Sequence, residues 1–142
     1  MLYFAYGSNM SSKRLESRLN SVKFKTVAKL NRHNLKFHKR SNDGSGKCDI
    51  DLTGDEDDVV YGVLYEIGES DKTELDSVEG LGNGYEEKQV SVTALDGETF
   101  IATTYYATHT DPSVKPYEWY KEHVLRGARE HGLPTDYIAM ID

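Results

Sequence analysis

The hydrophobic pattern at the start of the chain predicts a short buried strand that ends in a polar turn. An apolar run covers residues 2–6, and the polar residues 7–9 follow it. A helix is expected over residues 11–19, because Leu15 and Leu19 lie four residues apart and share one helix face. The beginning of the chain is therefore predicted to be a strand, a turn and a helix.

Alternation of apolar and polar residues with a period of two predicts that strands dominate the middle of the chain. A strand is also expected over residues 59–67, where Val60, Leu64 and Ile67 lie among two Tyr residues. The expected strands are residues 22–25, 27–30, 35–38, 48–52, 59–67, 85–95 and 99–107. Asp96 and Gly97 separate the last two, and an Asp-Gly pair is typical of a tight hairpin turn.

Helical spacing returns after the strand at residues 59–67. One helix is predicted over residues 72–78 and a longer one after residues 111–113, with Gly132 as its stop signal. Asp136 is expected to cap a last short helix. Strands outnumber helices and do not alternate strictly with them, which favours an α+β fold with a small mixed, barrel-like sheet flanked by a few helices.

Length and composition are typical of one globular domain that covers residues 1–142. Hydrophobic residues make up 37% of the chain, and 10 Tyr with 4 Phe supply ring surface for a core or a partly wetted pocket. The formal net charge of −7 disfavours binding to nucleic acid or to an anionic membrane. Basic residues between Lys23 and Arg40 alternate with apolar ones, so we interpret them as the solvated sides of strands.

The single cysteine, Cys48, excludes an intrachain disulfide and favours a cytoplasmic setting. No apolar run approaches the roughly 20 residues that span a bilayer, and the first residues lack the basic start of a signal peptide. We therefore expect a soluble cytoplasmic protein. No residue pattern around Cys48 indicates an activated thiol, so it is interpreted as inert.

The turn at Gly7, Ser8 and Asn9 is the first candidate site. Gly7 allows a close approach of the backbone to a ligand, and Ser8 or Asn9 can cap the next helix and leave its first N–H groups free for an anion. The alternative is an ordinary strand-turn-helix connection. Ser8 is not expected to be a hydrolase nucleophile, because the second glycine of a nucleophile elbow is missing.

Glu79 is the best titratable candidate. It lies at the C-terminal end of the helix predicted over residues 72–78, where the helix dipole raises the pKa of a carboxylate. A raised pKa suits a general acid or base near neutral pH. The alternative is a solvent-facing glutamate in a fraying turn.

Two other sequence patterns do not predict a nucleotide-binding site or a metal site. The glycine-rich stretch 80–84 follows a helix and precedes a strand, which does not match a nucleotide-binding loop. The five histidines have no Cys or acidic partner at ligand spacing, so no metal site is predicted.

Several segments together resemble the γ-glutamyl cyclotransferase family. The similarity runs from residue 3 to about residue 138 and rests on Tyr3-Phe4-Ala5-Tyr6-Gly7-Ser8-Asn9-Met10, on Leu75-Asp76-x-x-Glu79-Gly80, on Tyr85 at the start of a strand, on Gly127-Ala128, and on Gly132-Leu133-Pro134-x-x-Tyr137. The resemblance implies an α+β fold around a small mixed barrel, with no metal or organic cofactor. It also implies an intramolecular acyl transfer that converts a γ-glutamyl group to 5-oxoproline.

The resemblance implies a role for particular residues. Backbone N–H groups of residues 6–9, from Tyr6 to Asn9, would hold the substrate carboxylate, and Glu79 would move the proton. Tyr85 and Tyr137 would line the same pocket, with Asp76 as a neighbour of Glu79. The loops at residues 42–47 and 109–115 would receive the leaving group.

Alternatives remain at this stage. A non-enzymatic module could use the same loop for a small carboxylate ligand or a protein partner, and a related cyclotransferase would act on γ-glutamyl-amine conjugates. The sequence has no local signature that decides between a monomer and a homodimer.

Overall fold

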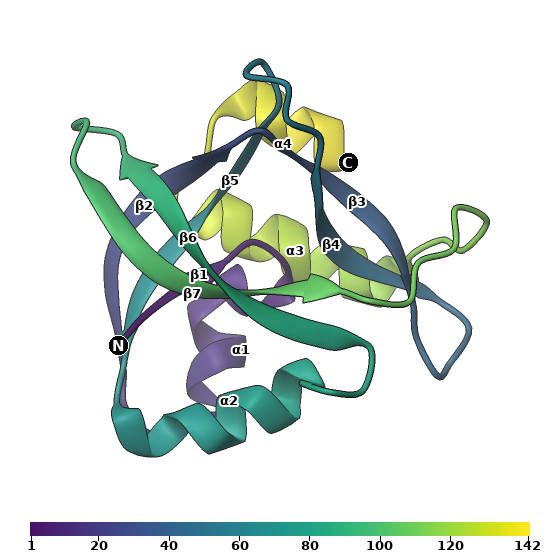
Figure 1. The fold of residues 1–142 in the computed structure, drawn as a ribbon, viewed down its shortest axis with the longest axis horizontal. Helices are drawn as coiled ribbons and strands as arrows, with labels where there is room; N and C mark the ends of the chain where they lie inside the picture. The colour runs from purple at the N-terminus through teal and green to yellow at the C-terminus, as the bar shows by residue number, and fades with distance from the viewer.

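A closed barrel of five strands forms the centre of the computed structural model, which describes residues 1–142. The strands follow one another around the barrel as β1-β5-β2-β6-β7 (Figure 1). Their bounds are β1 (Leu2–Ala5), β2 (Val22–Asn31), β5 (Val59–Ile67), β6 (Tyr85–Ala94) and β7 (Thr99–Ala107). A parallel pairing of β1 with β7, in which Tyr3 faces Thr103, closes the barrel, while the other neighbours are antiparallel. The predicted α+β class with a mixed, closed sheet is confirmed.

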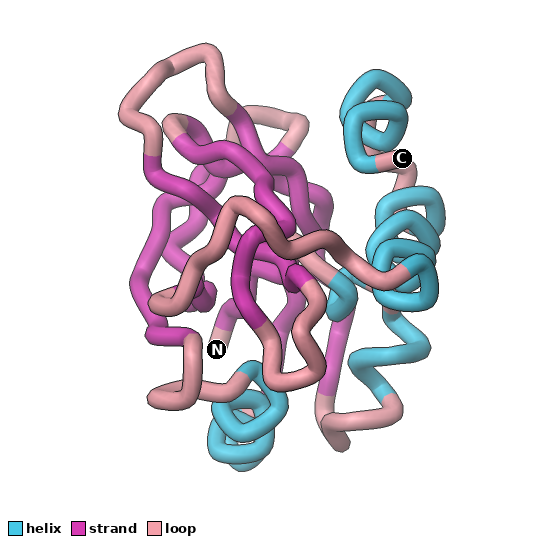
Figure 2. The backbone as a smooth tube through the Cα atoms, turned by 90° about the vertical axis from the view of Figure 1, so that its right-hand side faces the viewer, coloured by secondary structure: helices cyan, strands magenta, loops and turns pink.

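A separate two-stranded sheet and four helices surround the barrel. The sheet pairs β3 (His33–Arg40) with β4 (Gly46–Leu52), and the helices are α1 (Ser12–Glu16), α2 (Lys72–Glu79), α3 (Glu118–Glu130) and α4 (Thr135–Ile141), with short 3-10 turns η1 (Ser8–Met10) and η2 (Glu69–Asp71). Figure 2 shows α2 lying apart from the other helices, which gather on one side of the strands. None of the helices has both the length and the apolar character needed to cross a bilayer.

Strand predictions hold best where a run of β-branched and aromatic residues is bounded by turn residues. The bounds of β5 and β7 are those expected from the sequence. The two short strands predicted before residue 31 are one strand, β2, with a bulge between Phe24 and Thr26 that interrupts the alternation. A break between strands was expected at residues 31–34, but only Arg32 separates the end of β2 from the start of β3. Arg32 has a positive φ of 66°.

Helix starts differ from the predictions for a local reason. The chain makes the 3-10 turn η1 before α1 begins, so Ser11 caps α1 and its hydroxyl accepts from the backbone N–H of Arg14 at 3.4 Å. Ser8 and Asn9 therefore do not cap the helix as expected. The last helix, α4, starts after Pro134, and Asp136 lies in its first turn instead of capping it.

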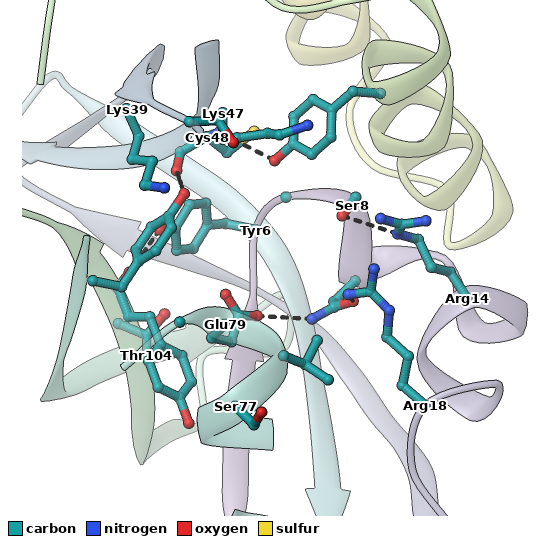
Figure 3. Close-up of a pocket in the computed structure, with 18 of the residues that line it drawn as sticks. Tyr6, Ser8, Arg14, Arg18, Lys39, Lys47, Cys48, Ser77, Glu79 and Thr104 are labelled. Atoms are coloured by element: carbon teal, nitrogen blue, oxygen red, sulfur yellow. Dashed lines mark hydrogen bonds between the residues drawn. The ribbon is translucent and has the colours of Figure 1, made fainter. Parts of the chain in front are cut away.

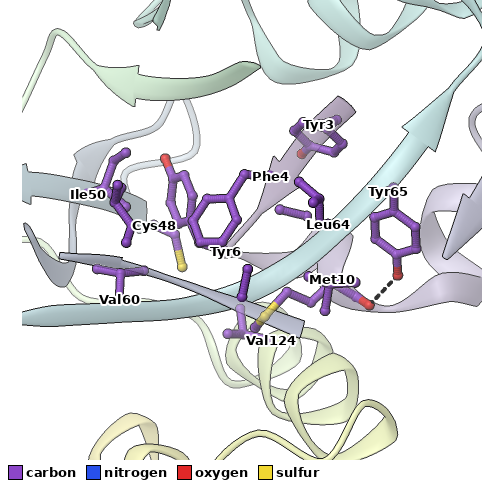
Figure 4. Packing of buried hydrophobic residues seen from close by; sticks show 14 of the residues in the cluster. Tyr3, Phe4, Tyr6, Met10, Cys48, Ile50, Val60, Leu64, Tyr65 and Val124 are labelled. Atoms are coloured by element: carbon purple, nitrogen blue, oxygen red, sulfur yellow. Dashed lines mark hydrogen bonds between the residues drawn. The ribbon is translucent and has the colours of Figure 1, made fainter. Parts of the chain in front are cut away.

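The core joins the barrel to α3 through η1. Phe4, Leu64 and Val124 are fully buried, and Met10 of η1 packs beside Val124 (Figure 4). Gly127 makes this packing possible, because a Cβ at that position would lie 2.4 Å from the backbone nitrogen of Ser11. The close approach holds the turn that follows β1 in place.

Candidate active site

A cavity of about 490 Å³ lies where the turn after β1, the end of α2 and the β3–β4 sheet meet. Gly7, Ser8, Asn9 and Glu79 line it together (Figure 3). The two candidate sites of the sequence, separated by some 70 residues, thus belong to one site.

The Glu79 carboxylate is held through one of its two oxygens. Its Oε1 accepts hydrogen bonds from the Tyr3 hydroxyl at 2.6 Å and from Asn9 Nδ2 at 2.7 Å. Its Oε2 accepts none from the protein, and Figure 3 shows this oxygen pointing away from Asn9 into the cavity. The geometry fixes the side chain and leaves one oxygen for a ligand.

Opposing effects act on the pKa of Glu79. Burial raises it, whereas the hydrogen bonds from Tyr3 and Asn9 and the charges of Arg18 and Arg14 lower it, and the balance leaves the pKa above its ordinary value. The raised pKa predicted from the sequence is confirmed in direction, but desolvation is its main cause. A raised pKa brings the Glu79 carboxyl closer to the range in which a general acid or base works.

The turn after β1 supplies free hydrogen-bond donors. The backbone N–H groups of Tyr6, Gly7, Ser8 and Asn9 donate no hydrogen bond to any protein acceptor, although Ser8 and Asn9 are buried. Buried N–H groups without an acceptor are rare in proteins. Four in succession beside a cavity suit an anionic group of a ligand.

Two arginines near α1 support this turn. Arg14 Nε donates to Ser8 Oγ at 3.2 Å, and an Arg18 guanidinium nitrogen donates to Asn9 Oδ1 at 3.1 Å. Asn9 is therefore bonded on both sides, to Arg18 through its oxygen and to Glu79 through its nitrogen. Neither arginine was predicted from the sequence to belong to the site, although their four-residue spacing indicates one shared helix face.

Replacing Arg18 is expected to shift the pH dependence of activity. In Arg18→Met, loss of the positive charge raises the pKa of Glu79 further. A general base works when deprotonated, so with Glu79 in that role the acidic limb of the kcat/KM profile moves to higher pH. Arg18→Lys keeps the charge and is the matched control. An unmoved acidic limb in Arg18→Met would contradict the coupling.

Three tyrosines of the cavity differ in what their hydroxyls do. Tyr85 donates to the Cys48 carbonyl and Tyr105 donates to Asp76 Oδ1, both at 2.6 Å. The Tyr120 hydroxyl accepts from the Cys48 N–H at 3.1 Å and lies beside the Cys48 thiol, with no oxygen acceptor for its own hydrogen. Tyr120 was not predicted from the sequence to belong to the site, because a buried aromatic residue in a helix such as α3 is typical of a core position.

Tyr137 does not line the cavity, in contrast to the sequence expectation. Its ring packs edge-on against Tyr61 of β5 with centroids 5.2 Å apart, and its buried hydroxyl has no hydrogen-bond partner. The turn after α3 directs α4 over the outside of the barrel, so Tyr137 faces β5 and not the site. Tyr85 does line the cavity, as expected.

Cys48 lies in the cavity wall, and burial raises its pKa to about 12. The thiol therefore stays protonated at neutral pH, in agreement with the sequence interpretation. No three His, Cys, Asp or Glu side chains gather to hold a metal ion.

A mixed five-stranded barrel with a partly buried acid that faces a glycine turn places the chain in a class of small α+β proteins. The model of the AIG2-like family matches residues 59–141. Gamma-glutamylcyclotransferases of Bos taurus and Homo sapiens are 35% and 33% identical to the chain, and each alignment covers 96% of this chain and 74% of the relative. A solved structure described as gamma-glutamyl cyclotransferase superposes with a TM-score of 0.92 at 31% identity, covering 99% of this chain and 85% of the other. The chain belongs to the gamma-glutamylcyclotransferase family, a family of enzymes.

Proposed function

We propose that this enzyme converts γ-glutamyl compounds to 5-oxoproline and a free amine or amino acid. The observation that carries the proposal is the free Oε2 of Glu79, which faces the same cavity as four unpaired backbone N–H groups. A proton acceptor and an anion site on one cavity match a substrate that has an ammonium and a carboxylate on the same carbon. The relatives named above support this activity.

The reaction begins with proton removal. Glu79 takes a proton from the α-ammonium of the γ-glutamyl group, and the resulting amine attacks the γ-carbonyl carbon of the same group. The new C–N bond closes a five-membered ring, and the bond from that carbon to the leaving nitrogen breaks. Glu79 passes its proton to the leaving nitrogen and then takes the second proton that the ring nitrogen loses as it becomes an amide. Both protons end on the released amine, which leaves as an ammonium, and no water is consumed.

Orientation of the substrate supplies much of the rate. The nucleophile is tethered to its target, and fixing the α-carboxylate on the N–H groups of Tyr6 to Asn9 selects the folded conformation that closes the ring. The negative charge that develops on the carbonyl oxygen needs a further donor. Because Tyr85 and Tyr105 are engaged elsewhere, the Tyr120 hydroxyl and the remaining N–H groups are the donors available.

Incubation with a panel of γ-glutamyl amino acids, peptides and amines tests the proposal. Mass spectrometry in H₂¹⁸O should detect 5-oxoproline without ¹⁸O and an equal amount of the released amine. Labelled glutamate would indicate hydrolysis instead of cyclisation. Absence of 5-oxoproline from every compound would contradict the enzymatic proposal and favour the non-catalytic binding module.

A further inference from the structure

Helix α2 carries Glu79 as its last residue, so the position of this carboxyl group depends on how α2 is attached to the barrel. Leu75 is the one buried residue of the helix, and Figure 2 shows α2 lying apart from the other helices. The start of α2 is held by Asp71, whose carboxylate accepts from the backbone N–H groups of Asn20 and Ser21 at 3.2 and 2.6 Å. The last turn of α2 needs an attachment of its own.

Asp76 supplies this attachment. Its Oδ1 accepts a hydrogen bond from the hydroxyl of Tyr105 in β7 at 2.6 Å. The same oxygen accepts from Lys72 Nζ, one turn earlier in α2, and Lys72 also pairs with Glu87 Oε2 of β6 at 2.9 Å. Glu87 and Tyr105 lie opposite each other in the pairing of β6 with β7, so the helix and the hairpin are joined at one place. The contacts of Asp76 with Tyr105 and Lys72, and of Lys72 with Glu87, are here called the Asp76 clamp.

The surroundings favour the central hydrogen bond of the Asp76 clamp. Tyr105 is 1% exposed, and burial together with the carboxylate of Asp76 raises the pKa of its hydroxyl. The phenol therefore stays protonated and remains a donor at neutral pH. A hydrogen bond to an ionised acceptor is stronger than one between neutral groups. The bond between Tyr105 and Asp76 is thus suited to fix the helix.

Tyr105 also contacts the site itself. Its ring packs edge-on against the ring of Tyr3 with centroids 6.0 Å apart, and its carbonyl oxygen accepts from the Tyr6 hydroxyl at 2.6 Å. Tyr3 in turn donates to Glu79 Oε1. Glu79 is therefore held in two ways, by the hydrogen bonds to its carboxylate and by the attachment of its helix, and Tyr105 takes part in both.

We propose that Asp76 and Tyr105 are positioning residues that keep Glu79 in place for proton transfer. The inference rests on the proposed function, in which Glu79 moves the proton. Without the Asp76 clamp the last turn of α2 can move away from Tyr3, and a misplaced proton carrier is slow. The substrate carboxylate is held by the turn after β1, so the Asp76 clamp acts on the chemical step and not on substrate binding.

Two substitutions of Asp76 separate geometry from charge. Asp76→Ala removes the acceptor of the Tyr105 hydroxyl, and kcat for 5-oxoproline release is expected to fall by about tenfold or more. KM should stay within about twofold of wild type, because the lost interaction serves the transition state. Alanine is a better helix former than aspartate, so a weaker helix does not explain the fall.

Asp76→Asn keeps an oxygen in the position of Oδ1, where Asp76 accepts from both Tyr105 and Lys72, and loses the charge. Its kcat should therefore stay within about threefold of wild type. A fall in Asp76→Asn as large as that in Asp76→Ala would show that the charge of Asp76 acts and not its hydrogen bond. That result would overturn the inference.

Tyr105→Phe tests the other end of the hydrogen bond. It keeps the ring against Tyr3 and the carbonyl that accepts from Tyr6, and it loses the hydroxyl alone. We expect the same fall in kcat as in Asp76→Ala, and no further fall in Asp76→Ala/Tyr105→Phe, because both substitutions break one bond. Effects that multiply in the double variant would show that the two residues act independently and would overturn the inference.

Glu74→Ala and Tyr106→Phe are the matched controls. Glu74 is exposed on α2, Tyr106 follows Tyr105 in β7, and neither residue lines the cavity. Both variants should have the kcat and KM of wild type, and circular dichroism checks that every variant is folded. A fall in kcat in either control as large as that in Asp76→Ala would contradict the special role of the Asp76 clamp.

The experiment separates the two proposals. If wild type and Asp76→Ala release 5-oxoproline at the same rate, the function stands and the inference fails. If wild type releases none from any γ-glutamyl compound, the function fails, and the inference fails with it.

Discussion

Glu79→Gln is expected to lower kcat by about 10²–10⁴-fold, the contribution typical of a positioned general acid or base. Glutamine keeps the shape of the side chain and an oxygen that can accept from Tyr3 and Asn9, as Glu79 Oε1 does. It cannot take a proton from the substrate ammonium. Steady-state kinetics with a γ-glutamyl substrate measure the effect, and thermal unfolding confirms that the variant is folded.

The matched control for this variant lies on the same helix. Glu74 of α2 is exposed and does not line the cavity, so Glu74→Gln removes one carboxylate without touching the site. Its kcat should equal that of wild type. Turnover by Glu79→Gln at the wild-type rate would contradict the assignment of Glu79 as the proton carrier.

Gly127→Ala is expected to lower the free energy of unfolding by about 2 kcal/mol. Overpacking of a tight site costs up to about 3 kcal/mol, and the better helix propensity of alanine offsets about 1 kcal/mol of that. The collision cannot be relieved by a rotamer change, because the new Cβ would lie 2.4 Å from the Ser11 nitrogen and 2.6 Å from the Met10 carbonyl carbon. Thermal denaturation should show Tm lower by roughly 7 °C.

Gly127→Ala is also expected to affect the cavity that contains Glu79. Met10 and Ser11 directly follow Asn9, so displacement of this turn moves the amide that holds Glu79 and should lower kcat/KM as well. Arg126→Ala, at an exposed position next to Gly127 in α3, is the control and should change stability by no more than about 0.5 kcal/mol. Wild-type stability and activity in Gly127→Ala would show that η1 can shift freely.

The sequence predicted strands well where turn residues bound a run of β-branched and aromatic residues. The runs of β-branched and aromatic residues in β5 and β7 gave their bounds, because such side chains favour strands and turn residues flank both runs. It was less accurate at turns. The start of α1 was expected after Ser8 and Asn9, but those side chains bond to Arg14, Arg18 and Glu79 instead of the helix N–H groups.

Some residues of the site could be predicted from local sequence features, and others could not. Glu79 and the turn at Gly7, Ser8 and Asn9 have local marks, namely a helix end and a glycine turn. Tyr3 lies in an apolar strand and Lys39 alternates with apolar neighbours, and nothing local distinguishes them from core and surface residues. Tyr137 fitted a motif, yet the packing of α4 takes it away from the cavity.

By itself, the sequence determined the α+β class, most strands and helices, and two halves of a site, since each depends on interactions between residues close in the chain. Only the tertiary structure decided that the halves meet, with Tyr3 and Glu79 joined across 76 positions. Closure of the barrel makes those contacts, and the burial it produces sets the pKa of Glu79. Burial and long-range contact are properties of the packed chain, which no local pattern specifies.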